Sequence, residues 1–126
     1  DEILRIHAPL IANRRRTTRP VEIGGRKIEA GAGISLNWAS ANRDECVFGD
    51  PDEFRLDRDP ESNLLYGKGI HDCPGAPLAR LELRVLMEEL LARTVSIEMA
   101  EDSEPVKAQY PASGYLSLML RIERKG

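Results

Sequence analysis

Several features that mark specialised proteins are scarce or missing in this chain. It has only two cysteines, so one disulfide at most can form, and a disulfide-built secreted scaffold is excluded. Its apolar runs last a few residues, far short of the ~20 that a membrane-spanning helix needs, and no secretory signal is visible. Its 18 basic and 21 acidic residues are interspersed, which argues against partners such as nucleic acid or an anionic membrane. We therefore expect a soluble, cytoplasmic protein.

The length of 126 residues suits one modest domain with an adequate hydrophobic core. The first residues, Asp1 to Arg5, have the pattern of a helix but no N-cap residue precedes them. A helix without its cap indicates that the natural polypeptide begins further upstream. We therefore expect residues 1–126 to be a portion of a longer protein.

Periodicity and turn residues predict an α+β fold with small sheets and one long helix. The glycine pair Gly24-Gly25 between alternating residues is typical of a β-hairpin turn, and Pro9 is expected to stop the opening helix. Two late strands have matching alternation and could pair with each other. The expected elements are a helix at 1–8, a hairpin within 14–29, strands at 34–38, 95–99 and 115–122, a short helix at 39–43, an irregular meander at 48–61 and a long helix at 76–94.

The long helix is predicted from apolar residues that recur at three- and four-residue spacing and form one apolar face. Pro77 suits its first turn, where a missing N–H costs nothing. Two ion pairs are expected on the other side, Arg84 with Glu88 and Glu89 with Arg93. The residues of the predicted apolar face are Ala79, Leu83, Leu86, Met87, Leu90 and Leu91.

The most informative stretch runs from Tyr66 to Gly75, where glycines surround Cys73 directly ahead of the long helix. Backbone N–H groups and the positive end of a helix dipole stabilise a thiolate at such a position, and the thiolate is the form of cysteine that binds metal. The glycines allow the backbone to approach a large, flat group closely. The pattern predicts a thiolate presented against a bulky cofactor; the alternative is a small buried thiol in a glycine-rich turn.

This stretch resembles the cysteine-ligand loop of the cytochromes P450, the haem-thiolate monooxygenases. The family pattern is Phe-Gly-x-Gly-x-His/Arg-x-Cys-x-Gly, and it is matched here at Gly67, Gly69, His71, Cys73 and Gly75, with Tyr66 in the place of the usual Phe. The resemblance implies haem as the cofactor, with Cys73 as the iron ligand and His71 as a partner of a haem propionate. It also places Tyr66, Gly67 and Gly75 beside the haem.

The resemblance gives a role to Glu2 and Arg5, which lie three residues apart on one face of the first helix. Alone, this spacing indicates only an ordinary surface ion pair. In the family a Glu-x-x-Arg motif on the K helix is completed by an arginine from the meander, and Arg58 matches that third member. The implied role is structural: a buried network that locks the loop behind the haem.

Each of the other basic residues that match the family has two possible interpretations. Arg14 matches the position of a propionate-binding arginine in similar bacterial members, with Arg16 as its rival; the alternative is a solvated basic run. Lys68, Arg80 and Arg84 match a surface that docks a ferredoxin or a flavin reductase, although they could equally form a solvated helix face.

The resemblance implies that residues 1–126 are the C-terminal, haem-binding portion of the fold: the end of the K helix, a small sheet, the meander, the ligand loop, the long L helix and a terminal hairpin. The parent protein is then expected to activate O₂ and oxidise a small apolar substrate. This chain alone is expected to be limited to haem binding. The alternatives are a free-standing haem-binding module and a haem-free scaffold.

Overall fold

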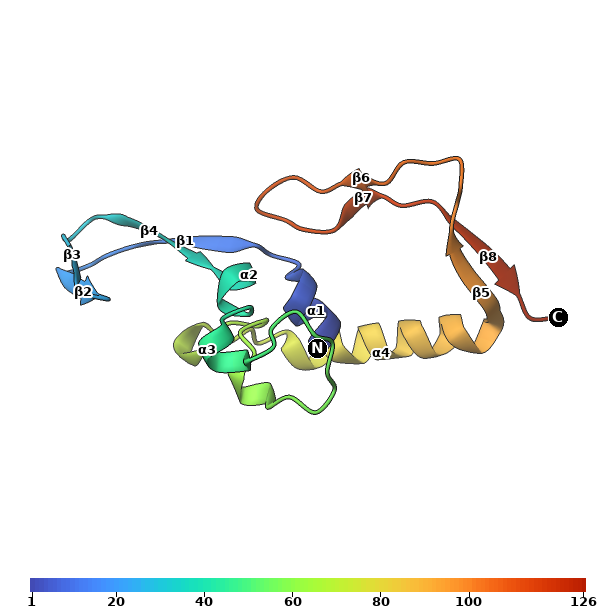
Figure 1. Cartoon of the computed structure of the whole chain (residues 1–126), viewed down its shortest axis with the longest axis horizontal. Helices are drawn as coiled ribbons and strands as arrows, with labels where there is room; N and C mark the ends of the chain where they lie inside the picture. Colours follow the sequence, from blue (N-terminus) through green and yellow to red (C-terminus); the bar gives the residue numbers. More distant parts are fainter. The chain divides into compact units, whose positions relative to one another are not determined.

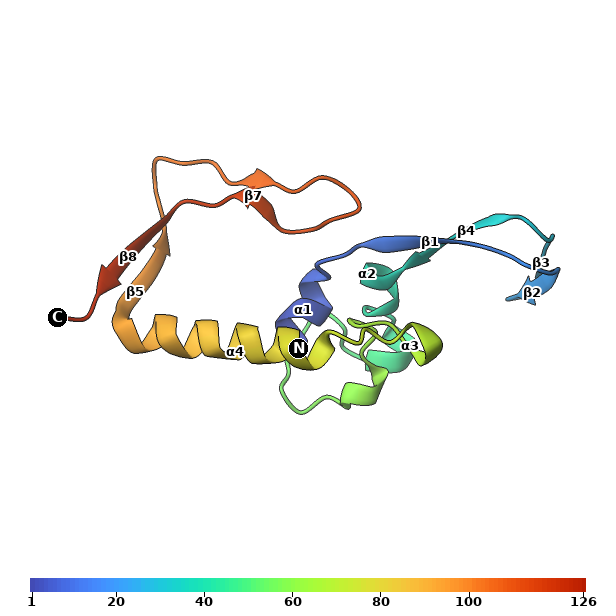
Figure 2. The same ribbon diagram turned by 180° about the vertical axis from the view of Figure 1, so that it is seen from behind.

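The computed structural model describes all residues from 1 to 126, and they divide into two compact units. The meander unit consists of Glu2–Leu65 and Tyr110–Ser113. The loop–helix unit consists of Asp1, Tyr66–Gln109 and Gly114–Gly126. Figures 1 and 2 show the elements of each unit from opposite sides.

The meander unit begins with α1 (Glu2–His7), which confirms the helix expected at its start. Strand β1 (Ala12–Arg16) pairs antiparallel with β4 (Gly33–Asn37), and the predicted hairpin forms as β2 (Val21–Ile23) and β3 (Arg26–Ile28). Gly24 and Gly25 make its turn with φ of 54° and 76°, a left-handed conformation that glycine adopts without strain. In Figure 1 this hairpin lies at the far end of the β1–β4 ribbon.

Short helices with side-chain caps follow β4. The expected helix near residues 39–43 is α2 (Trp38–Ala41), capped by the Asn37 side chain, which accepts a hydrogen bond from Ser40 N. Helix α3 (Glu45–Phe48) and the 3₁₀ turn η1 (Pro60–Ser62) were not predicted. A single turn has no periodicity to detect, and only its cap residue identifies it.

The loop–helix unit contains the 3₁₀ turn η2 (Gly69–His71) and α4 (Ala76–Arg93), which confirms the long helix. Strand β5 (Thr94–Met99) leaves the end of α4 and pairs antiparallel with β8 (Leu120–Arg124), as the ribbon in Figures 1 and 2 shows. The prediction of one strand over residues 115–122 was wrong. Its first part is β7 (Tyr115–Ser117), which pairs with β6 (Val106–Lys107) instead, so the segment changes partner between β7 and β8.

The apolar core is smaller than the sequence led us to expect, because only Ala8, Ala12 and Ala76 are buried apolar residues. Helix α4 exposes apolar side chains both on the predicted face and outside it: Leu86, on that face, is 60% exposed, and Leu78, outside it, is 59% exposed. A helix that is apolar on several sides normally lies in a protein interior. These faces are therefore suited to packing that the 126 residues do not provide.

On the polar side of α4, Glu89 and Arg93 form the expected ion pair at 2.5 Å, whereas Arg84 and Glu88 do not pair. Such exposed pairs add little stability, so the difference is of small consequence for the fold. None of the helices combines the length and the apolar character needed to cross a lipid bilayer.

Candidate functional site

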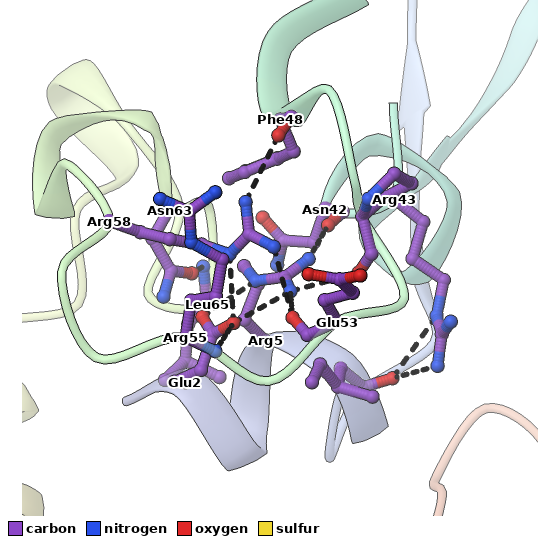
Figure 3. Close-up of polar contacts among 12 residues, drawn as sticks. Glu2, Arg5, Asn42, Arg43, Phe48, Glu53, Arg55, Arg58, Asn63 and Leu65 are labelled. Carbon is purple, nitrogen blue, oxygen red and sulfur yellow. Dashed lines mark hydrogen bonds and ion pairs between the residues drawn. The ribbon is translucent and has the colours of Figure 1, made fainter. Parts of the chain in front are cut away.

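The centre of the meander unit is a carboxylate shared by two arginines (Figure 3). Arg5 is 1% exposed and donates two hydrogen bonds to Glu2, from Nε to Oε2 at 2.7 Å and from Nη2 to Oε1 at 2.8 Å. Arg58 donates from Nε to the same Glu2 Oε1 at 3.0 Å. The structure therefore brings together the three residues that the sequence placed in one network.

The remaining guanidinium donors bind backbone carbonyls of the irregular meander. Arg5 Nη1 donates to the carbonyl of Asn42 at 2.6 Å, and Arg5 Nη2 donates to that of Pro51 at 2.9 Å. Arg58 donates to the carbonyls of Phe48 at 3.0 Å and Glu53 at 2.9 Å. Because regular secondary structure does not satisfy these carbonyls, the two arginines take the place of a hydrogen-bond ladder.

The same contacts shift the carboxyl groups toward their charged form. The hydrogen bond from Arg5, with smaller effects of Arg55 and Arg58, lowers the pKa of Glu2 to about 2 although its burial acts in the opposite direction. Hydrogen bonds from Arg55 and Arg58 likewise lower the pKa of Asp50 to about 2. The network is therefore fully ionised at neutral pH.

Asn42 is a residue of this network whose role the sequence did not reveal. It is fully buried, its carbonyl binds Arg5, and its side-chain Oδ1 accepts a hydrogen bond from the Leu64 N–H at 2.8 Å. Asn42 thus joins α1, through its backbone carbonyl, to the segment around Leu64, through its side chain. An asparagine at the end of a short helix has the signature of an ordinary turn, so spacing alone could not distinguish it.

The ligand loop is folded by its own backbone. The Cys73 N–H donates to the carbonyl of Tyr66 at 2.9 Å, and the Cys73 carbonyl accepts from Ala76 N at 3.1 Å, where α4 begins. Gly67 has φ of 83°, and a Cβ on it would lie 2.8 Å from the His71 carbonyl oxygen. Only glycine fits there, because this close approach closes the loop and leaves no room for a side chain.

The Cys73 thiol is free and exposed at the start of an 18-residue helix. A Cβ on Gly75 would lie 3.7 Å from the Cys73 sulfur, so that side of the thiol is open. No cluster of three or more His, Cys, Asp or Glu residues that could hold a bare metal ion exists in the chain. A single exposed thiol is the donor that the haem expected from the sequence would need from this chain, because a porphyrin brings its own nitrogen ligands to the iron.

The other residues predicted for this site fall in both units. His71 ends η2 and is exposed, as are Lys68 and Arg84. Arg80 forms an ion pair with Asp1 at 2.8 Å, and its guanidinium lies 4.6 Å from the centre of the Tyr66 ring. Arg14 is exposed on β1 in the meander unit, so its pairing with His71 at one cofactor stays a prediction.

Replacing Glu2 with Gln is expected to destabilise the chain strongly. The change leaves the buried Arg5 guanidinium without its carboxylate and removes one of the two carboxylates that pair with Arg58. Breaking a buried pair in this way costs roughly 3 kcal/mol. The free energy of unfolding, from urea denaturation, measures the effect. The control is Glu89→Gln, which breaks an exposed pair worth only about 0.5 kcal/mol or less. Similar losses of unfolding free energy in Glu2→Gln and Glu89→Gln would show that the buried network stabilises the chain no more than an exposed ion pair does.

The Glu2 pKa also predicts how acid affects stability. The folded pKa of about 2 lies below the ordinary value of 4.5, so the stabilisation is complete above pH 4.5 and disappears as the pH falls toward 2. The free-energy difference between the wild type and Glu2→Gln should therefore be constant above that range and shrink within it. A difference independent of pH from 5 to 2 would show that Glu2 has an unshifted pKa.

A matched pair of glycine substitutions tests the loop closure. Gly67 and Gly69 both have positive φ, of 83° and 69°, but a Cβ on Gly69 meets no atom within 4 Å. Both Gly→Ala changes carry the cost of a left-handed alanine, of about 1 kcal/mol, and only Gly67→Ala adds a clash with backbone. Urea denaturation should show the larger loss for Gly67→Ala. Equal losses would mean that the close approach to His71 is absent in solution.

Comparison with known proteins agrees with this geometry. The cytochrome P450 family profile matches residues 1–123. Cytochrome P450 119 of Sulfolobus acidocaldarius is 42% identical over 123 residues, which are 98% of this chain and 33% of that protein. The steroid C26-monooxygenase of Mycolicibacterium smegmatis is 44% identical over 103 residues, 82% of this chain and 26% of that protein.

A solved structure gives the same result for the fold. Cytochrome P450 CYP109Q5 from Chondromyces apiculatus superimposes with a TM-score of 0.88 at 40% identity, over 98% of this chain and 32% of that one. The chain thus spans about a quarter to a third of the length of the relatives it matches. On the match of nearly all its residues to the family profile, the chain belongs to the cytochrome P450 family.

Proposed function

We propose that this chain is the cysteine-ligand portion of a haem-thiolate monooxygenase and that its own task is to hold haem through Cys73. One observation carries the proposal: an exposed, unpaired thiol stands at the start of α4, on a loop that its own backbone closes. Family membership supports the same cofactor. In the parent protein, bound haem would supply the redox chemistry by which O₂ oxidises a small apolar substrate.

Each residue that the resemblance singles out has a distinct part in this proposal. Cys73 would hold the iron through its sulfur. His71 and Arg14 would each hold a propionate by charge-assisted hydrogen bonds. Gly67 and Gly75 would let the backbone approach the flat cofactor closely, with the Tyr66 ring beside it.

Electron delivery requires a partner, and we propose a ferredoxin or a flavin reductase that docks on the cationic side of the loop–helix unit. Lys68, Arg80 and Arg84 are all exposed in this unit. Positive side chains steer an acidic partner by raising the rate of encounter, an effect that falls with ionic strength.

The substrate pocket and the groups that deliver protons are proposed to lie in polypeptide beyond these residues. Two observations support this: the chain spans a third or less of its relatives, and α4 exposes apolar side chains on several sides. A relative named as a steroid C26-monooxygenase is consistent with an apolar substrate for the parent protein.

The absorption spectrum of the chain with added haem, reduced and exposed to carbon monoxide, tests the proposal. A strongly red-shifted Soret band is expected, since a thiolate donates electron density to the iron. Cys73→Ser should abolish this band, whereas the matched control Cys46→Ser should leave it unchanged, because Cys46 lies outside the loop. A band that persists without Cys73 would refute the assignment, and a chain that takes up no haem would favour the scaffold alternative.

A further inference from the structure

We infer that Arg80 is a positioning residue for the ligand loop, which holds Tyr66 in place and through it the backbone of Cys73. The inference rests on the proposed function for its consequence, since it concerns the loop that presents the iron ligand. It adds a role within the loop–helix unit to the partner-docking role proposed for Arg80. The inference follows from the contacts that Arg80 and Tyr66 make.

Tyr66 is the anchor of the loop's closing hydrogen bond, because its carbonyl accepts the Cys73 N–H at 2.9 Å. The next residue, Gly67, has φ of 83° and gives the backbone little stiffness of its own. The position of the Tyr66 carbonyl therefore depends on what holds the rest of that residue. The buried Tyr66 hydroxyl makes no hydrogen bond, so the phenol oxygen does not hold the residue in place.

The Arg80 guanidinium supplies the missing support. It lies 4.6 Å from the centre of the Tyr66 ring, well within the range of a cation–π contact. Asp1 fixes the edge of the guanidinium: Arg80 Nε donates a hydrogen bond to the Asp1 carboxylate at 2.8 Å, and Arg80 Nη2 forms an ion pair with the same carboxylate at 2.8 Å. A planar group held by its edge can stack with its face on an aromatic ring.

The chain of contacts thus runs from Asp1 to Arg80, to the Tyr66 ring, and through the Tyr66 carbonyl to the Cys73 amide, all within the loop–helix unit. Arg84 offers a contrast one turn further along α4. It is exposed and has no ion pair, so it remains suited to a docking partner. Arg80 therefore has a positioning role, besides docking, that Arg84 does not share.

Amide hydrogen exchange of Cys73 in the 126-residue chain, measured by NMR without haem, tests the inference. Arg80→Ala should speed this exchange by about 2- to 5-fold, the size of a partly exposed cation–π contact expressed as an equilibrium constant. Amides in the middle of α4 should keep their rates. The matched control Arg84→Ala, which removes the same charge from the same helix, should change neither.

A second variant identifies the ring as the partner. In a Tyr66→Leu background, Arg80→Ala should change the Cys73 exchange rate by less than about 1.5-fold, because the contact that it would break is already gone. The inference is wrong if Cys73 exchange is unaffected by Arg80→Ala or unprotected in the wild type. It is also wrong if Arg80→Ala speeds exchange throughout the chain, or acts equally with and without the ring.

The outcome is independent of the proposed function. A wild type that gives no red-shifted band with haem would overturn the haem assignment, whatever the exchange rates. A red-shifted band together with unchanged Cys73 exchange in Arg80→Ala would overturn only the positioning role.

Discussion

The meander unit depends on one carboxylate, that of Glu2, which accepts hydrogen bonds from both Arg5 and Arg58. Charge-assisted hydrogen bonds of this kind are about twice as strong as neutral ones, and burial protects them from salt. The arginines then bind the carbonyls of a segment that has almost no regular structure. Ala8 and Ala12 are the only buried apolar residues of this unit, so the polar network makes much of the contact in its interior.

The loop–helix unit instead exposes a free thiol on a defined backbone. A thiol fixed by side-chain packing would be covered, whereas Cys73 is held by its own N–H and remains exposed. Glycine at position 67 permits the tight closure, and α4 provides the electrostatic environment of a helix N-terminus. The hydrogen bonds that close the loop lie entirely between residues 66 and 76.

The sequence predicted what local patterns encode. Helix α4 follows from the recurrence of its leucines, the β2–β3 hairpin from Gly24-Gly25, and the tight loop ahead of α4 from its glycines. It did not predict the change of partner between β7 and β8, because alternation shows that a segment is extended but not which strand it joins. Nor did it show that Asn42 links α1 to Leu64, since contacts so distant in sequence leave no periodic trace. The role of Arg14 was suggested only by resemblance.

The way in which Arg5 and Arg58 hold the meander has a consequence for how this segment can evolve. Both arginines bind main-chain oxygens, at Asn42, Pro51, Phe48 and Glu53, and every amino acid presents the same oxygen. The side chains of exposed meander residues such as Glu53 and Phe54 are therefore released from the task of holding the segment together. Mutation can alter the chemistry of that surface freely while the path of the chain is inherited unchanged. A fixed scaffold with a variable exterior is the combination that lets related proteins acquire different binding partners.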